Sequence, residues 1–289
     1  MNTKFLNFFE QPETNNTRMV IGFSGWMDGG EVSTGTVEYL AQTARARPLA
    51  EIETGAFSIY NFPGDMELAA MLRPHTRIED GLVTSYESPV NTFAYDEENQ
   101  LILFEGKEPH VRWKAFAESI LGVVTACNVQ EIYFVGSVAS LVPHTREPRF
   151  FGSVSAEEHK PLLKNYNLIP SNYEGPASFT TYLYTQCRAR GILMMSIVAE
   201  TPAYVQGRNV RCIRASVDKL GSILGLELDT DPLRKEYLHF DEKLHRIVQS
   251  RPDLAQQIQK MEEAFDKENY QSQSDELKAW FERQDIQLD

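Results

Sequence analysis

Residues 19–46 read MVIGFSGWMDGGEVSTGTVEYLAQTARA, and this stretch sets the expectation for the whole fold. The apolar run at 19–23 has the length and composition of a buried strand, and 31–46 repeats apolar residues at helical spacing. A glycine-rich turn joins the two. Strand, turn and helix in this order are typical of α/β proteins, so further strand–helix units are expected along the chain.

The same alternation continues as far as about residue 230. Strands are expected at 19–23, 82–86, 101–104, 132–135, 150–154 and 191–198, and helices at 31–46, 110–127, 177–190 and 210–224. The strands are apolar along their whole length, which is typical of a parallel sheet covered on both faces. The pattern predicts a layered α/β core over residues 1–230.

The pattern changes after about residue 231, where neither a strand nor a glycine is found. Apolar residues recur there at helical spacing, so residues 231–289 are predicted to form a helical extension of two or three segments. The letters SRPD predict a helix restart, with Ser250 as its cap, Pro252 in its first turn and Asp253 as the capping acid. The apolar faces of these helices pack on the core or contact an oligomer partner, and the sequence leaves both open.

Composition excludes several classes of protein. The 289 residues carry a formal net charge of −13, which does not favour binding to nucleic acid or to an anionic membrane. No apolar run approaches the roughly 20 residues of a membrane span, and the first residues lack the apolar run of a signal peptide. We therefore expect a soluble, cytoplasmic protein.

The cysteines point to the same compartment. Cys127, Cys187 and Cys212 are odd in number, lie in helix-like stretches and show no paired metal spacing. They are interpreted as reduced core thiols. The sequence contains no histidine–cysteine cluster either, so neither a metal site nor a cofactor is expected.

The glycine-rich turn resembles places where proteins bind phosphate at a helix N-terminus. Here, however, Asp28 and Glu31 have the spacing of a capping box, and two carboxylates at the positive end of a helix would repel a phosphate. No nucleotide-binding fingerprint is present. Gly25 and Gly29 are therefore expected to serve the tight turn, while Trp26 at its tip is a pocket lid or a contact residue.

The stretch LFEGKEPHVRW at 103–113 permits two interpretations. Glu108 could begin a helix and pair with Arg112 one turn later. Alternatively, Glu105 could belong to a site, because open α/β sheets bind ligands at the carboxyl ends of their strands.

A second candidate stretch, GSVASLVPHTREP at 136–148, follows another apolar strand. His144, Thr145 and Arg146 place a titratable ring, a hydroxyl and a fixed cation side by side. Such a trio could bind a carboxylate or phosphate or support acid–base chemistry, although a loop histidine can also serve structure alone. The elbow motif of a hydrolase is absent, so Ser137 and Ser140 are not expected to act as nucleophiles.

Two later loops complete the candidates. NYEGPASF at 172–179 contributes Tyr173 and Gly175, and AETPAYVQG at 199–207 contributes Glu200 and Tyr204. Both are expected at the same end of the sheet, although turn chemistry alone explains their glycines and prolines.

Six motifs occur in an order typical of one family: GFSGWMDGGEVSTGTVEYL, RPHTRIEDG, LILFEGKEPHVRW, VPHTREP, YEGPASF and TPAYV. Together they resemble the proteasome assembly chaperone family, in the branch of the second chaperone and its archaeal and bacterial relatives. The likeness runs from about residue 17 to 230. The positions that match the family are Gly25, Trp26, Asp28, Gly29, Gly106, Glu108, Pro109, Trp113, Pro143, His144, Thr145, Arg146, Tyr173, Gly175 and Pro176.

The resemblance implies a three-layer α/β/α sandwich similar to nucleoside phosphorylases, and homo-oligomers such as dimers or trimers. It implies no established catalysis, because the eukaryotic relatives hold proteasome α-subunits during ring assembly. Some bacterial members carry a label of ATP-dependent ligase, which nothing in this sequence supports. Ala203 stands where the family often has histidine, which weakens any shared acid–base chemistry, and the terminal Leu288-Asp289 lacks the proteasome-docking ending of some archaeal relatives.

Two functions therefore compete. The first is a non-catalytic chaperone or scaffold that self-associates and binds another protein. The alternative is a phosphorylase-like enzyme, or a binder of nucleoside, phosphate or carboxylate, whose pocket at the strand ends is lined by Glu105, Glu108, His144 and Arg146. The absence of a complete catalytic set favours the first.

Overall fold

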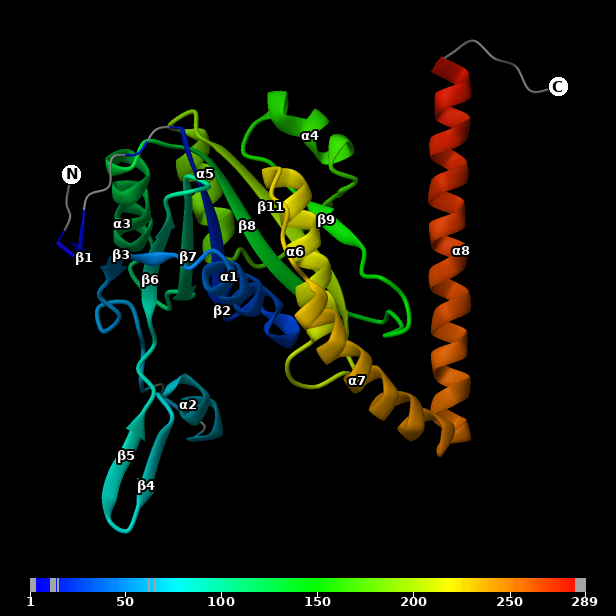
Figure 1. The fold of residues 1–289 in the computed structure, drawn as a ribbon, viewed down its shortest axis with the longest axis horizontal. Helices are drawn as coiled ribbons and strands as arrows, with labels where there is room; N and C mark the ends of the chain where they lie inside the picture. Colours follow the sequence, from blue (N-terminus) through cyan, green and yellow to red (C-terminus); the bar gives the residue numbers. More distant parts are fainter. Residues whose placement is uncertain (1–3, 11–13, 15, 62, 65, 284–289) are drawn as a thin grey trace.

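The computed structural model describes residues 4–10, 14, 16–61, 63–64 and 66–283, and shows a nine-stranded sheet with helices on both faces (Figure 1). The strands lie in the order β1 (Leu6–Phe8), β3 (Arg47–Ile52), β6 (Asn91–Asp96), β7 (Leu101–Lys107), β2 (Thr17–Ser24), β8 (Val129–Ser140), β11 (Leu193–Pro202), β9 (Phe150–Gly152) and β10 (Ile169–Pro170). The four central strands, β7, β2, β8 and β11, are parallel. Around them β6, β3, β1 and β9 pair antiparallel.

Helices α1 (Val32–Thr43) and α6 (Val210–Leu224) cover one face of the sheet, and α3 (Trp113–Ala126) and α5 (Phe179–Arg188) cover the other. Each face has its own buried cluster, because neighbouring residues of a strand point to opposite sides. In β2, for example, Ile21 packs with the α3–α5 cluster and Val20 with the α1–α6 cluster. The three-layer α/β/α architecture predicted from the sequence is confirmed.

Three short helical elements lie between the larger elements along the sequence. They are α4 (Lys160–Asn165) and two short 3₁₀ turns, η1 (Gly29–Glu31) and η2 (Glu157–His159). The expected strand at 150–154 is shorter than predicted, ending at Gly152, and the expected helices at 31–46, 110–127 and 177–190 each begin and end one to three residues inside those limits.

The expected strand at 82–86 is present, but it does not join the main sheet. It is β5 (Leu82–Tyr86), which pairs with β4 (Thr76–Glu79) in a separate two-stranded hairpin that projects from the molecule beside α2 (Met66–Leu72) (Figure 1). Asp80 and Gly81 form its two-residue turn, and both have a positive φ, as a tight hairpin turn requires.

The helical extension consists of α7 (Asp231–Gln249) and the 32-residue α8 (Pro252–Arg283) in the described part of the chain. The helix restart at Pro252 is confirmed, but Ser250 does not cap α8: its hydroxyl donates to the carbonyl of Ile247 at the end of α7. Ile258 and Phe265 of α8 are buried. Among the described residues, no helix is both long and apolar enough to cross a bilayer.

Candidate functional site

The loops that follow β2, β7, β8 and β11 carry most of the predicted site residues. Because these strands are parallel, their loops meet at the carboxyl edge of the sheet. The amide of Ser137 donates to the carbonyl of Met27, and the Ser137 hydroxyl donates to the carbonyl of Gly29. Ser137 thus fixes the position of the loop that follows β2. The predicted residues separate into one group around Glu108 and one around His144.

Glu108 clamps two loops together. One carboxylate oxygen accepts from the N–H of Trp26 at 3.0 Å, and the other accepts from the N–H of Phe179, the first residue of α5, at 2.8 Å. The prediction that Glu108 begins a helix and pairs with Arg112 is wrong. The helix begins at Trp113, and the left-handed φ of 59° at Arg112 breaks the turn that such a pair would need.

Two aromatic residues of this group contact the segment that leads into α5. Trp113 is half-buried, donates its indole N–H to the carbonyl of Pro109 at 2.8 Å, and packs edge-on against the ring of Phe179. Tyr173 is 68% exposed and donates its hydroxyl to the carbonyl of Pro176.

Glycines in this region allow close approach. A Cβ at Gly106 would lie 2.6 Å from the ring of Phe104, and one at Gly175 would lie 2.5 Å from the hydroxyl of Tyr173. Gly106 therefore has a structural reason, because the ring of Phe104 is buried and cannot move away. At Gly175 the exposed side chain of Tyr173 can move aside, so the close approach does not by itself require a glycine.

Asp28 caps α1. Its carboxylate accepts from the amides of Ser33 and Thr34 at 2.8 and 3.2 Å, and from the hydroxyl of Thr34 at 2.9 Å. Burial raises the pKa of Asp28, while the hydrogen bonds from Thr34 and Ser33 act in the opposite direction. The expected carboxylate at this helix end is therefore confirmed for Asp28.

The expected capping box is not formed. Glu31 is exposed, has a left-handed φ of 53° and makes no capping hydrogen bond; its carboxylate lies 3.8 Å from the guanidinium of Arg208. The N–H of Asp28, which Glu31 would have satisfied, donates instead to the carbonyl of Gly25. Gly30 and Glu31 both have a positive φ, so the backbone between Asp28 and Glu31 lacks the geometry of a capping box.

Glu105 lies half-buried at the end of β7. Burial raises the pKa of its carboxyl, and the nearby charges of Glu38 and Asp28 raise it further. Arg208 acts in the opposite direction and pairs with Glu38 at 3.0 Å. Glu105 is thus close enough to Asp28 for their charges to interact, which was not predicted. Among the described residues no hydrogen bond or ion pair joins Glu105 to His144, with which it was predicted to line a pocket.

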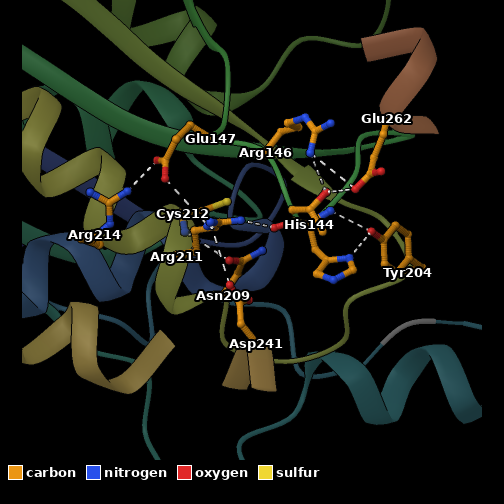
Figure 2. Close-up of polar contacts among 11 residues, drawn as sticks. His144, Arg146, Glu147, Tyr204, Asn209, Arg211, Cys212, Arg214, Asp241 and Glu262 are labelled. Carbon is orange, nitrogen blue, oxygen red and sulfur yellow. Dashed lines mark hydrogen bonds and ion pairs between the residues drawn. The ribbon is translucent and has the colours of Figure 1, made fainter. Parts of the chain in front are cut away.

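His144 is held by Tyr204 (Figure 2). The amide of His144 donates to the Tyr204 hydroxyl at 2.7 Å, and the ring Nδ1 lies 2.7 Å from the same oxygen. Arg211 of α6 donates to the carbonyl of His144. Burial lowers the pKa of His144, so a neutral ring that accepts the phenol proton fits the geometry.

The neighbouring Thr145 and Arg146 are engaged by α8. Arg146 forms a two-point ion pair with Asp266, at 2.9 Å through Nε and 2.7 Å through Nη2, and lies 3.4 Å from Glu262. Thr145 donates its hydroxyl to Glu262 (Figure 2). The predicted anion-binding cation is therefore paired with carboxylates of the same chain.

Sequence reasoning missed the ion pairs that surround this loop. Arg149 pairs with the buried Glu200 at 2.7 Å and with Glu268 at 2.8 Å, and its guanidinium stacks on Phe265. Arg211 and Arg214 share Glu147, with Asp241 of α7 also close to Arg211. No local spacing could have pointed to these pairs, because Arg149 and Glu200 are 51 residues apart and Arg146 and Asp266 are 120 apart.

The space enclosed by this loop, α6, α7 and α8 is a cavity of about 20 Å³. Its walls include His144, Glu200 and Phe265. A volume of this size admits about one water molecule, so the His144 group is packed rather than open to a nucleoside. In the described residues, no group of three or more acidic, histidine or cysteine side chains is arranged to hold a metal ion.

The carboxyl edge of the sheet nevertheless exposes apolar side chains. We call the set formed by Trp26, Val138, Leu141 and Tyr173 the strand-end face. These side chains are between 38% and 82% exposed, and the contacts of Trp26 with Glu108 and of Met27 with Ser137 bring their loops together.

Comparison with known proteins identifies relatives of this chain. A family model described as the PAC2 family matches residues 22–248. A comparison with curated protein sequences finds no match.

Solved structures of similar fold come from bacteria and archaea. A Mycobacterium tuberculosis protein described as a proteasome-assembly chaperone homologue is 23% identical, with a TM-score of 0.72 over 84% of this chain and 100% of its own. A second M. tuberculosis protein, of unknown function, is 17% identical, with a TM-score of 0.82 over 94% and 92%. PbaB of Pyrococcus furiosus, described as an archaeal proteasome activator, is 20% identical, with a TM-score of 0.63 over 84% and 97%.

Proposed function

Since the chain belongs to the PAC2 family, we propose that it is a non-catalytic chaperone or scaffold that self-associates and binds protein partners. The observation that carries the proposal is the family match over residues 22–248, together with similar structures described as proteasome-assembly chaperone homologues. The partner class suggested by those descriptions is a proteasome subunit. Three buried free cysteines support a role in the reducing cytoplasm.

The geometry of the strand ends supports binding over catalysis. Three polar groups that could act on a substrate are occupied within the chain: Asp28 by α1, Glu108 by two backbone amides, and Arg146 by α8. General acid–base chemistry needs a group within hydrogen-bond reach of a substrate, and the His144 ring is turned instead toward Tyr204.

The strand-end face supplies the kind of surface that a protein partner uses. Aromatic residues are enriched where proteins bind one another, and Trp26 and Tyr173 are each about two-thirds exposed. We infer that this face, with the candidate residues Gly25, Trp26, Glu108 and Tyr173 in its loops, contacts the partner.

Two measurements on the purified full chain test the proposal. Light scattering or sedimentation should give a mass above that of one chain. Native mass spectrometry with purified proteasome α-subunits, the client class that the resemblance implies, should give a complex. A chain that stays monomeric and binds no subunit contradicts the proposal.

Matched variants locate the binding surface. Trp26→Ser with Tyr173→Ser should abolish the complex with the subunit, whereas Phe9→Ser should preserve it. Phe9 is also exposed, at 52%, but it follows β1 at an outer edge of the sheet. Equal binding by all three proteins would exclude the strand-end face.

A further inference from the structure

The loop between β8 and β9 contains a candidate cation for binding a carboxylate, and α8 supplies the carboxylates that it binds. Arg146 contacts Asp266 at 2.9 and 2.7 Å and Glu262 at 3.4 Å. Thr145 donates its hydroxyl to Glu262 as well. Two residues of the motif VPHTREP are therefore occupied by the side chains of one helix.

This helix lies outside the region that the chain shares with its family. The family model matches residues 22–248, whereas α8 begins at Pro252. The residues that bind the carboxylates thus belong to the family core, and the residues that supply them follow it in the chain. The β8–β9 loop is in this sense a binding surface of the core with an occupant from outside it.

One face of α8 contacts the loop, and its pattern defines what the loop recognises. The face consists of Ile258 and the residues four, seven and eight positions later, namely Glu262, Phe265 and Asp266. Phe265 is buried, and the guanidinium of Arg149 lies 4.7 Å from the centre of its ring. The loop therefore recognises an aromatic side chain that has a carboxylate on either side of it along a helix.

The attachment of α8 to the rest of the chain is limited. Of the α8 side chains that the structure describes, Ile258 and Phe265 are buried and the others are at least partly exposed. The carboxylate of Asp266 lies largely in solvent, where ion pairs contribute little. Two residues link α8 to α7, and Figure 1 shows the two helices diverging from that link. A helix attached in this way can leave the loop as one unit while the sheet stays folded.

We propose that the β8–β9 loop is a docking site for an acidic amphipathic helix of another protein, and that α8 keeps this site closed. The partner helix presents an aromatic residue to Arg149 and flanking carboxylates to Arg146, as α8 does. The site includes none of the residues of the strand-end face, so the inference goes beyond the proposed function.

Charge complementarity at the loop favours this partner. Displacing α8 takes away both carboxylates that contact Arg146, and leaves Arg149 with Glu200. The net charge of −13 opposes attraction of an acidic segment over long distances, but physiological salt screens charges more than about 8 Å apart. The two arginines therefore determine which side chains bind at the loop.

A fluorescent peptide with the sequence of residues 252–269 tests the proposal on the full chain. In the unaltered chain, α8 competes at an effective concentration on the order of 1 mM, so micromolar peptide should stay unbound in fluorescence anisotropy. Phe265→Ala weakens this internal competitor, because it removes the buried ring. The variant chain should bind the peptide at least about 10-fold more tightly than the unaltered chain does. A peptide that carries the same Phe265→Ala change is the control and should not bind.

Charge reversal in the Phe265→Ala chain shows where the peptide binds. Arg146→Glu places a like charge against the carboxylates of the peptide and should raise the dissociation constant about fivefold or more. Arg188→Glu is the matched control, because Arg188 is exposed on α5, which covers the sheet face opposite α6. It should change the dissociation constant by less than about twofold.

Ile258→Ala is a second variant in case Phe265→Ala has a folding defect, since it weakens α8 at its other buried residue. Peptide binding by either variant, with slow hydrogen exchange retained in β8, supports the proposal. If both variants fold and neither binds the peptide more tightly than the unaltered chain, α8 is a permanent part of the fold and the proposal is wrong. Loss of protection in β8 in both variants would overturn it too, as would peptide binding that is insensitive to Arg146→Glu.

Discussion

The N–H of Phe179 donates a 2.8 Å hydrogen bond to the carboxylate of Glu108, and so fixes the start of α5 against the end of β7. The second oxygen of the same carboxylate accepts from Trp26. One side chain therefore positions three of the loops at the carboxyl edge of the sheet.

Removing this carboxylate should loosen the edge. Glu108→Ala leaves the buried N–H of Phe179 without its acceptor, so we expect the free energy of unfolding to fall by about 1–3 kcal/mol in urea. Glu108→Gln keeps one acceptor and should lose less than half as much. Glu174→Ala, in the exposed neighbouring loop, is the control, and an equal loss there would contradict the clamp.

The cap of α1 gives a second test. Asp28→Ala removes the acceptor of two helix amides and should destabilise the chain by about 1–2 kcal/mol. Glu31→Ala should have little effect, because its exposed carboxylate caps nothing. Thermal unfolding of both variants distinguishes this geometry from a capping box, in which both changes would be costly.

The same cap predicts the response to anions. Because Asp28 occupies the first amides of α1, orthophosphate or ATP should not raise the melting temperature beyond the effect of sulfate at matched ionic strength. A saturable rise with ligand concentration would contradict this view and favour the small-ligand alternative.

His144 should make stability fall on mild acidification. Burial lowers its folded-state pKa below the unfolded value of 6.5, so the unfolded chain binds the proton more readily. The stabilisation of the folded chain by the neutral His144 ring is fully present above pH 6.5. As the pH falls from there through the folded pKa, the free energy of unfolding decreases by up to about 1.4 kcal/mol per pH unit.

His144→Gln should flatten this slope between pH 6.5 and about 5, a window above the titration of most carboxylates. Urea unfolding at several pH values measures it. His75→Gln, at an exposed position, controls for loss of a histidine. An unchanged slope in His144→Gln would show that the ring titrates freely.

Docking of α8 should depend on Phe265 more than on its ion pairs. Phe265 is buried, and its replacement by Ala should cost about 3 kcal/mol of docking. Hydrogen exchange should then become fast along α8 while the sheet stays protected. Asp266→Ala should change little, because its carboxylate lies in solvent. The reverse ranking would show that charge holds the helix.

The central layers were predictable because covered parallel strands are apolar throughout. Strand β7, with LILF at its start, shows this pattern. The outer strands do not: β3 reads RPLAEI and mixes exposed with buried residues, and β4 is exposed throughout, so both were missed. Strand β5 was placed correctly in the sequence, but an apolar run does not say which sheet it joins.

The sequence indicated which candidate residues follow a strand better than it indicated which partners they contact. Parallel topology sufficed to expect Trp26 and Glu108 at one edge, because each follows one of two parallel strands, β2 and β7. Tyr173 follows β10, which does not run parallel to the central strands, so the same argument does not place it. The partners of Arg146 lie about 120 residues away, and a single sequence gives no means of pairing them. Arg112 and Glu31 have left-handed backbones, which residues other than glycine adopt too rarely to be expected.

The place of β2 in the sheet bears on how the chain folds during synthesis. This strand is made early, yet its two neighbours are β7 and β8, and the latter ends at Ser140. At about 5–20 residues per second, the apolar segment around Ile21 waits roughly 6–25 s after leaving the ribosome before both neighbours exist. A nascent chain of this protein is therefore exposed to aggregation until its middle third is translated, and slower translation ahead of β8 would lengthen that period.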